Sequence, residues 1–252
     1  MQMASDNIIE LENVNIQFEG KIALSSLSFS VKKGERIALI GPSGAGKTTL
    51  LNTMATFIKP STGKLLIHDQ DSTELKDRKQ LAKKMGMIRQ QFDLVDQLPV
   101  IHNVLAGKLG EWGFFKSLLS LVFPQEKDTA AHALERVGLI DKLFEKTSNL
   151  SGGEQQRVAL ARLLVQKPDI ILADEPVASL DPARSEDVLS MLTKLVIEEN
   201  QTLITSLHSV EYAKKYFTRI IALRDGALYF DLPVAEVKAD SLASLYQIGE
   251  QV

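Results

Sequence analysis

A glycine-rich segment constrains this chain more than any other feature. Residues 41–48 read GPSGAGKT, which matches the pattern G-x-x-x-x-G-K-[ST]. Its glycines let backbone N–H groups converge on phosphate oxygens, and a helix expected over 48–57 adds its positive end. The apolar residues 36–40 predict a buried strand before the loop. Strand, loop and helix in this order predict a phosphate site in an α/β fold with a largely parallel sheet.

Two side chains of this segment carry specific chemistry. Lys47 should reach the β- and γ-phosphates of a nucleotide, and the Thr48 hydroxyl should bind Mg²⁺. The alternative is a glycine-rich turn without a ligand, which the strand and helix around it disfavour. The remaining residues expected at the nucleotide are Gly41, Pro42, Ser43, Gly44, Ala45, Gly46 and Thr49.

Two carboxylates follow a second buried strand, predicted at 169–173. Phosphoryl transfer needs an acid that holds the metal and a group that orients or deprotonates water. Asp174 suits the first role and Glu175 the second. Alone, the pair fits a solvated acidic turn before Pro176 equally well, but together with the phosphate loop it predicts a nucleotide hydrolase.

A second candidate anion site begins at residue 150, where the sequence reads LSGGEQQR. Ser151 and Glu154 form an S-x-x-E capping box for a helix that should run to about residue 166. Gly152 and Gly153 are costly in a first helical turn that needs only a cap. They expose backbone N–H groups at the positive end of the helix, more than 100 residues from the phosphate loop. Capping and anion binding are compatible here.

LSGGEQQR followed by ILADEP resembles the signature and Walker B motifs of ABC ATPases, and the resemblance covers nearly the whole chain. It implies a P-loop NTPase (RecA-like) core, an ABC-type helical subdomain and a small antiparallel β subdomain. ATP and Mg²⁺ are the implied cofactors. In a homodimer, Ser151 and Gly153 would contact the γ-phosphate of ATP held by the other subunit, with Gly152 and Glu154 beside them.

The resemblance places further residues at the nucleotide. Gln90 matches the Q-loop glutamine, which binds Mg²⁺ and takes part in catalysis, although the adjacent Gln91 is an alternative. Phe18 matches the aromatic residue that stacks on adenine, where tyrosine is commoner, and its other interpretation is an apolar strand residue.

Two more residues match catalytic elements of the family. His208 matches the switch histidine, and Ser179-Leu180-Asp181 matches the D-loop. The alternatives are a solvated turn for His208 and a turn acid before Pro182 for Asp181.

The chain should form a single ABC ATPase domain over residues 7–231, with a helical subdomain inserted at about 90–167 and a short tail over 232–252. Apolar runs at 220–223 and 227–230 flank Asp-Gly, which predicts a hairpin.

Composition excludes several classes of protein. With 252 residues, 44% of them hydrophobic, the chain can bury a core. It has no cysteine, so disulfides and thiolate metal sites are excluded, and its net charge of −3 disfavours a nucleic-acid partner. We expect no signal peptide at the N-terminus and no spanning helix, since no run approaches about 18 apolar residues.

The residues from 90 to 124 are similar to the phosphonate importer ATPases. That resemblance implies two transmembrane permease subunits, a periplasmic or lipid-anchored solute-binding protein, and a peripheral position on the cytoplasmic face of a bacterial inner membrane. Phosphonate, phosphite and related solutes remain open. Residues 112–123 predict either an amphipathic helix that caps the helical subdomain or a docking surface near the membrane subunit.

Three rival functions remain. The first is another transport role, such as amino-acid import or lipoprotein release. The second is a soluble ABC ATPase that acts on DNA or ribosomes, which usually has a long coiled coil or two cassettes in one chain. The third, a non-enzymatic nucleotide-binding module, is disfavoured by Lys47, Asp174, Glu175 and His208 together.

Overall fold

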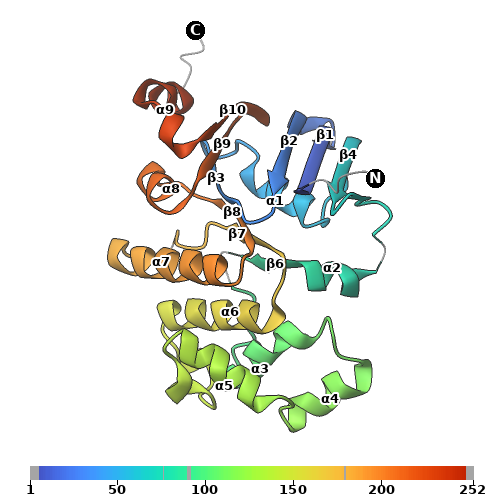
Figure 1. Cartoon of the computed structure of the whole chain (residues 1–252), viewed down its shortest axis with the longest axis vertical. Helices are drawn as coiled ribbons and strands as arrows, with labels where there is room; N and C mark the ends of the chain where they lie inside the picture. The colour runs from blue at the N-terminus through green and yellow to red at the C-terminus, as the bar shows by residue number, and fades with distance from the viewer. Residues whose placement is uncertain (1–5, 76, 90–91, 179, 248–252) are drawn as a thin grey trace. The chain divides into compact units, whose positions relative to one another are not determined.

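The computed structural model describes residues 6–75, 77–89, 92–178 and 180–247. The chain forms two compact units. The first comprises residues 1–76, 172–176 and 202–252, and the second comprises residues 77–171 and 177–201. Figure 1 shows the helices and strands of both.

An antiparallel sheet in the first unit has the strand order β2-β1-β4-β5. Its strands are β1 (Asn7–Phe18), β2 (Lys21–Lys32), β4 (Thr62–Ile67) and β5 (Gln70–Asp71). Along β1 and β2, Ile9, Leu11, Leu24 and Leu27 are buried, so one face of this sheet contributes to the core. The small antiparallel sheet expected from the family resemblance is therefore present.

The second sheet of this unit has the order β10-β9-β3-β8-β7. β3 pairs in parallel with both β8 and β9, whereas β9 and β10 form an antiparallel hairpin. Its strands are β3 (Arg36–Ile40), β7 (Ile170–Asp174), β8 (Thr202–Ser206), β9 (Arg219–Arg224) and β10 (Ala227–Pro233). The predicted strands at 36–40 and 202–206 and the predicted hairpin are confirmed, because short apolar runs bounded by turns are local signals.

Helix α1 (Lys47–Met54) follows β3 after the phosphate loop and contacts β8 and β2. It buries Leu50, Leu51 and Met54. The predicted helix is confirmed, but it ends at residue 54 rather than 57. The unit also contains α8 (Val210–Tyr216), η4 (Val234–Glu236) and α9 (Ala239–Tyr246).

The second unit is mainly helical. Its central element is α6 (Gly152–Gln166), which contacts α3, α5, η1 and α7. The start of β7 lies in this unit, where it neighbours β6 (Met85–Ile88). The other elements are α2 (Arg78–Lys84), α3 (Val100–Leu105), η1 (Ala106–Lys108), α4 (Phe114–Val122), α5 (Lys127–Arg136), η2 (Ile140–Lys142), η3 (Thr147–Asn149) and α7 (Pro182–Glu198). The helical insertion predicted at about 90–167 falls within the first segment of this unit.

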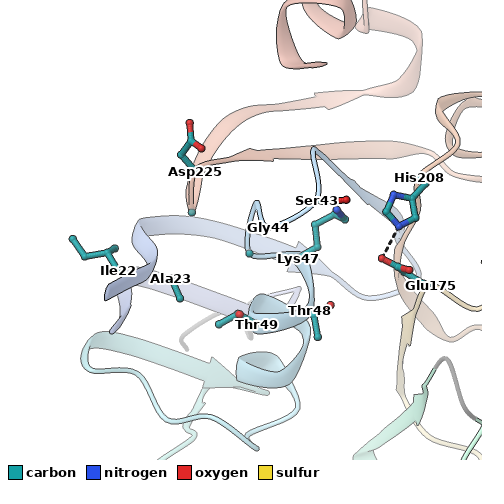
Figure 2. A pocket seen from close by; sticks show the side chains of 12 residues that line it. Ile22, Ala23, Ser43, Gly44, Lys47, Thr48, Thr49, Glu175, His208 and Asp225 are labelled. Atoms are coloured by element: carbon teal, nitrogen blue, oxygen red, sulfur yellow. Dashed lines mark hydrogen bonds and ion pairs between the residues drawn. The ribbon is translucent and has the colours of Figure 1, made fainter. Parts of the chain in front are cut away.

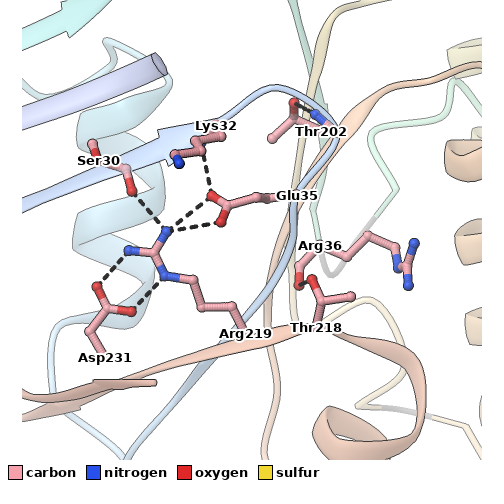
Figure 3. Close-up of polar contacts among 9 residues, drawn as sticks. Ser30, Lys32, Glu35, Arg36, Thr202, Thr218, Arg219 and Asp231 are labelled. Atoms are coloured by element: carbon pink, nitrogen blue, oxygen red, sulfur yellow. Dashed lines mark hydrogen bonds and ion pairs between the residues drawn. The ribbon is translucent and has the colours of Figure 1, made fainter. Parts of the chain in front are cut away.

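An arginine network joins the two sheets of the first unit. Arg219 in β9 makes two 2.6 Å hydrogen bonds to the Asp231 carboxylate in β10. It also donates to Glu35 at 3.0 Å and to the Ser30 carbonyl oxygen at 2.9 Å (Figure 3). The hydrogen bonds with Asp231 raise the pKa of Arg219 above its usual value, while burial lowers it. The network therefore fixes the β9–β10 hairpin against β2 and the turn that follows β2.

Replacing Arg219 with alanine should lower the free energy of unfolding by about 2–3 kcal/mol, because charged hydrogen bonds are lost and the partly buried acids Glu35 and Asp231 are left without their cation. Urea denaturation followed by circular dichroism measures this. Arg184→Ala is the control, since its ion pair with Asp181 is largely exposed and should contribute less than about 1 kcal/mol. Equal losses in the two variants would contradict a stabilising role for the network.

Among the described residues, no helix has the length and apolar character needed to cross a membrane.

Candidate functional site

A cavity of about 620 Å³ lies in the first unit, around the end of the phosphate loop. Figure 2 shows that loop, strand and turn residues all reach it. Its lining residues are Ile22, Ala23, Ser43, Gly44, Gly46, Lys47, Thr48, Thr49, Glu175, His208, Asp225 and Gly226. The fold thus brings the predicted phosphate loop together with the predicted acid and histidine.

Close packing explains why two positions of the loop are glycine. A Cβ atom on Gly41 would lie 2.1 Å from the Leu223 carbonyl oxygen in β9. A Cβ atom on Gly46 would lie 2.7 Å from Leu24 Cδ2, and the φ angle of Gly46 is +98°. Side chains at either position would displace the loop from the sheets behind it.

The N-terminus of α1 faces this cavity without a side-chain cap. Its N-cap is Gly46 in the left-handed conformation, and no side chain hydrogen-bonds there. Thr48 and Thr49 in the first turn both line the cavity. Uncapped N–H groups at the positive end of a helix are suited to binding an anion.

Lys47 is the cation of this loop, and it is 5% exposed. Its Nζ donates to the carbonyl oxygens of Gly41 at 2.9 Å and Pro42 at 3.1 Å. Burial lowers the pKa of Lys47, whereas the charges of Glu175 and Asp174 raise it. A phosphate anion would supply the negative charge that these neutral carbonyl groups lack.

Three oxygen-bearing side chains meet beside the loop. The Thr48 hydroxyl donates to Asp174 Oδ1 at 3.2 Å, and the Ser206 hydroxyl donates to the same oxygen at 2.7 Å. Hard oxygen ligands such as hydroxyl and carboxylate groups suit Mg²⁺, which keeps several waters and phosphate oxygens in its shell. The donor set of Thr48 and Asp174 therefore fits the metal that the sequence predicted.

Glu175 has an unusual backbone conformation, with a φ angle of +48°. Its N–H donates to Ser206 Oγ at 2.8 Å, which holds the residue in place. Glu175 Oε1 lies 2.6 Å from His208 Nε2, as Figure 2 shows. A non-glycine residue held at positive φ in a cavity, with its carboxylate oriented by a histidine, is the kind of arrangement found at reactive sites.

The predicted signature segment lies in the second unit, at the start of α6. The Ser151 hydroxyl accepts from the Glu154 N–H, and the Glu154 carboxylate accepts from the Ser151 N–H, so the predicted capping box is confirmed. The Glu154 carboxylate accepts from both the Ser151 N–H and the Ser151 hydroxyl, each at 2.8 Å. These two hydrogen bonds, the backbone one first, hold the pKa of Glu154 below its usual value.

A separate cavity of about 290 Å³ adjoins this segment within the second unit. Its lining includes Ser151, Gly153 and Glu154 together with the basic residues Lys142, Arg157 and Arg184. Gly152 has open space where a Cβ atom would lie. The acids Asp141 and Asp187 also line this cavity, and Arg157 and Arg184 are paired with Asp187 and Asp181. The cavity is therefore of mixed charge, and anion binding at the start of α6 remains a prediction.

Other predicted site residues lie elsewhere or outside the described chain. Asp181 is the N-cap of α7 and accepts from the Arg184 N–H at 3.0 Å, within the second unit. Phe18, at the end of β1, is 47% exposed and is not among the residues that line the large cavity. Gln90, Gln91 and Ser179 lie outside the described residues. The roles predicted for all of these remain predictions.

Sequence reasoning missed Ile22, Ala23, Asp225 and Gly226 as lining residues. It identified Asp225-Gly226 only as a hairpin turn. The fold explains their position, because the Ser25 N–H donates to the Gly226 carbonyl oxygen at 2.8 Å and the Gly226 N–H donates to Ala45 at 3.2 Å. These hydrogen bonds join segments about 200 residues apart, and no local pattern predicts such a contact.

The chain is similar in sequence to known ATP-binding proteins of ABC transporters. Residues 24–178 match the sequence profile described as ABC transporter. A phosphonates import ATP-binding protein from Pseudomonas syringae pv. tomato is 47% identical over 229 residues, which cover 90% of this chain and 86% of that protein. A phosphonates import ATP-binding protein from Halalkalibacterium halodurans is 40% identical over 95% of this chain and 94% of that protein.

Solved structures of ABC transporter cassettes also resemble this chain. A dimeric bacterial ABC transporter cassette superposes with a TM-score of 0.75 and 32% identity, over 90% of this chain and 98% of that chain. CbiO1 from Clostridium perfringens, part of an ABC transporter complex, superposes with a TM-score of 0.80 and 25% identity, over 92% of this chain and 90% of that chain.

Proposed function

The chain belongs to the ABC transporter family of ATP-binding proteins, and from this premise we propose that it is the ATP-hydrolysing subunit of an importer for a phosphonate, phosphite or related phosphorus oxyanion. The proposed class of solute is supported by the 47% identity to a phosphonates import ATP-binding protein over 90% of the chain. The cavity that joins Lys47, Glu175 and His208 supports the hydrolytic part.

In this proposal the phosphate loop binds the nucleotide. Lys47 leaves the carbonyl oxygens of Gly41 and Pro42 and pairs with the β- and γ-phosphates, because a buried ammonium gains more from an anion than from neutral carbonyl groups. Backbone N–H groups of residues 43–49 hold the other phosphate oxygens. Phe18 stacks on the adenine ring.

Hydrolysis is proposed to use the acids that follow β7. Thr48 and Asp174 would hold Mg²⁺, with Gln90 as a further ligand, and the ion would supply positive charge beside the transferred phosphate. Glu175 accepts a proton from the attacking water while the water oxygen bonds to the γ-phosphorus and the bond to the bridging oxygen breaks, so that ADP leaves. His208 keeps the Glu175 carboxylate in position through the 2.6 Å contact.

The working form is proposed to be a homodimer in which the signature surface of one copy completes the site of the other. Ser151, Gly152, Gly153 and Glu154 would meet the γ-phosphate held by the partner's loop, with Asp181 at the same interface. Two observations support this: Ser151 and Gly153 line a second cavity that shares no residue with the cavity at the phosphate loop, and the similar cassette of 32% identity is dimeric.

ATP-driven closure of this dimer would act on two transmembrane permease subunits, and a periplasmic or lipid-anchored binding protein would deliver the solute. The chain would lie on the cytoplasmic face of the inner membrane. The solute itself would never touch this chain, whose proposed anion sites are shaped for nucleotide phosphates.

Uptake by whole cells tests the solute class. A strain that lacks this chain should lose uptake of labelled methylphosphonate or phosphite, while amino-acid uptake stays normal. The wild-type gene should restore uptake, and a gene encoding Glu175→Gln should not. Loss of amino-acid uptake with normal uptake of both phosphorus oxyanions would overturn the solute assignment and leave the ATPase assignment intact.

A further inference from the structure

Helix α4 (Phe114–Val122) exposes an unusual concentration of apolar side chains. Phe115 is 86% exposed, and its apolar neighbours in the helix are all at least half exposed. The exposed apolar residues of this segment are Phe114, Phe115, Leu118, Leu119, Leu121, Val122 and Phe123. We refer to these seven residues as the α4 apolar surface.

The orientation of α4 is the reverse of an ordinary surface helix, which buries its apolar side and exposes its polar side. At about 100° per residue, the α4 apolar surface spans an arc of about 200°, and Lys116, Ser117 and Ser120 occupy the remainder. Ser120 is 4% exposed, the only buried residue of the helix. The polar side therefore faces the protein, and the apolar side faces outward.

Contacts within the second unit hold α4 in this orientation. The Lys116 ammonium donates to Glu126 at 2.6 Å, and Trp112, which is buried, donates to the same carboxylate oxygen at 3.2 Å. The Ser117 hydroxyl donates to the Gly113 carbonyl oxygen at 3.1 Å, and Ser120 accepts from the Gln125 N–H. Lys116 and Ser120 thus have partners in the segment that follows the helix, whereas Ser117 bonds to the N-cap of its own helix. The apolar side of α4 points away from Glu126 and Gln125.

The α4 apolar surface is too large to be the ordinary exposure of scattered apolar side chains. Seven mostly open side chains present on the order of several hundred Å² of apolar area, as large as the largest patch on an ordinary monomer. Leaving such an area in water is unfavourable by roughly 25 cal/mol per Å². A fixed helix with this exposure indicates that an apolar partner covers it.

We propose that α4 is an interfacial helix that inserts its apolar surface into the headgroup and upper acyl region of a lipid bilayer. Helices that lie in a membrane interface combine Phe and Leu on one side with a polar side, and they need no hydrogen-bond partners along the apolar side. The α4 apolar surface has that composition and carries no polar group that a protein partner would have to match.

Charge plays a small part in the proposed contact, because the lysines near the helix already have acidic partners. Lys116 and Lys108 are already paired with Glu126 and Glu111. The attraction is therefore chiefly apolar, and binding should persist in high salt and depend little on anionic lipid.

This inference adds a membrane contact made by the chain itself to the proposed function, in which permease subunits alone link it to the membrane. Its test uses the purified chain and vesicles without permease subunits. A failure would therefore leave the ATPase and solute assignments untouched.

The experiment is flotation of the full-length protein with vesicles of phosphatidylethanolamine and phosphatidylglycerol. The wild type should float with the vesicles, and the variant Phe115→Ser/Leu118→Ser/Val122→Ser should lose at least about tenfold in partition coefficient. The matched control Phe57→Ser/Val95→Ser/Ile197→Ser removes three exposed apolar side chains elsewhere and should bind within about twofold of wild type. Unchanged ATPase activity in both variants checks folding.

Three results would overturn the proposal. One is a wild type that stays with the unbound fraction, and another is an α4 variant that floats as well as the wild type. The third is a wild type that does not bind vesicles, together with an α4 variant that no longer self-associates or no longer co-purifies with permease subunits. That result would assign the surface to a second copy or to a membrane protein instead.

Discussion

Replacing Glu175 with glutamine should lower the rate of ATP hydrolysis by about 10²–10⁴-fold while ATP binding is retained, since that is the usual contribution of a general base. The carboxylate lies 2.6 Å from His208 and lines the large cavity, and the amide has nearly the same shape but cannot accept the proton of water. Phosphate release under saturating ATP and Mg²⁺ measures the effect, and nucleotide titration measures binding.

Glu211→Gln is the matched control. Glu211 lies three residues after His208, in the first turn of α8, and is exposed, so its loss should change turnover less than about twofold. Turnover of Glu175→Gln within a few-fold of wild type would show that another group activates water.

Removing the Lys47 ammonium should weaken ATP binding by about 10- to 100-fold, the usual value of a charged hydrogen bond, and should reduce turnover sharply. Nζ of Lys47 is the cation held inside the phosphate loop, and its carbonyl partners cannot replace it at a phosphate. Calorimetric titration of Lys47→Ala with ATP and Mg²⁺ gives the affinity directly.

Lys59→Ala removes an exposed lysine just beyond α1 and should leave affinity and turnover unchanged, which separates the local effect from a change in net charge. If Lys47→Ala matched wild type in both titration and turnover, the phosphate-loop interpretation would be wrong.

Local patterns predicted much of this fold. The strands at 36–40 and 202–206, the hairpin around Asp225 and the cap at Ser151 follow from apolar runs and turn or capping residues within a few positions. The phosphate loop could likewise be read directly, because its glycines and Lys47 lie together in the sequence.

What the sequence missed depends on contacts between distant segments. The Asp225-Gly226 turn reaches the phosphate loop only because β9 pairs in parallel with β3. The hydrogen bond from Thr48 to Asp174 joins residues separated by 126 positions. Neither arrangement leaves a signal in the spacing of nearby residues.

The orientation of α4 illustrates a different limit. Periodicity shows that Phe115 and Leu118 share one side of a helix, but it does not show whether that side faces the protein or the outside. Only the partners of Lys116 and the burial of Ser120 settle the direction.

The structure of the Glu175→Gln protein crystallised with ATP and Mg²⁺ tests the central claim most directly. We expect phosphates held by the loop at Lys47, Mg²⁺ at Thr48 and Asp174, and Ser151 of a second copy at the γ-phosphate. ATP bound away from Lys47, or bound there with no second copy at the γ-phosphate, would contradict it.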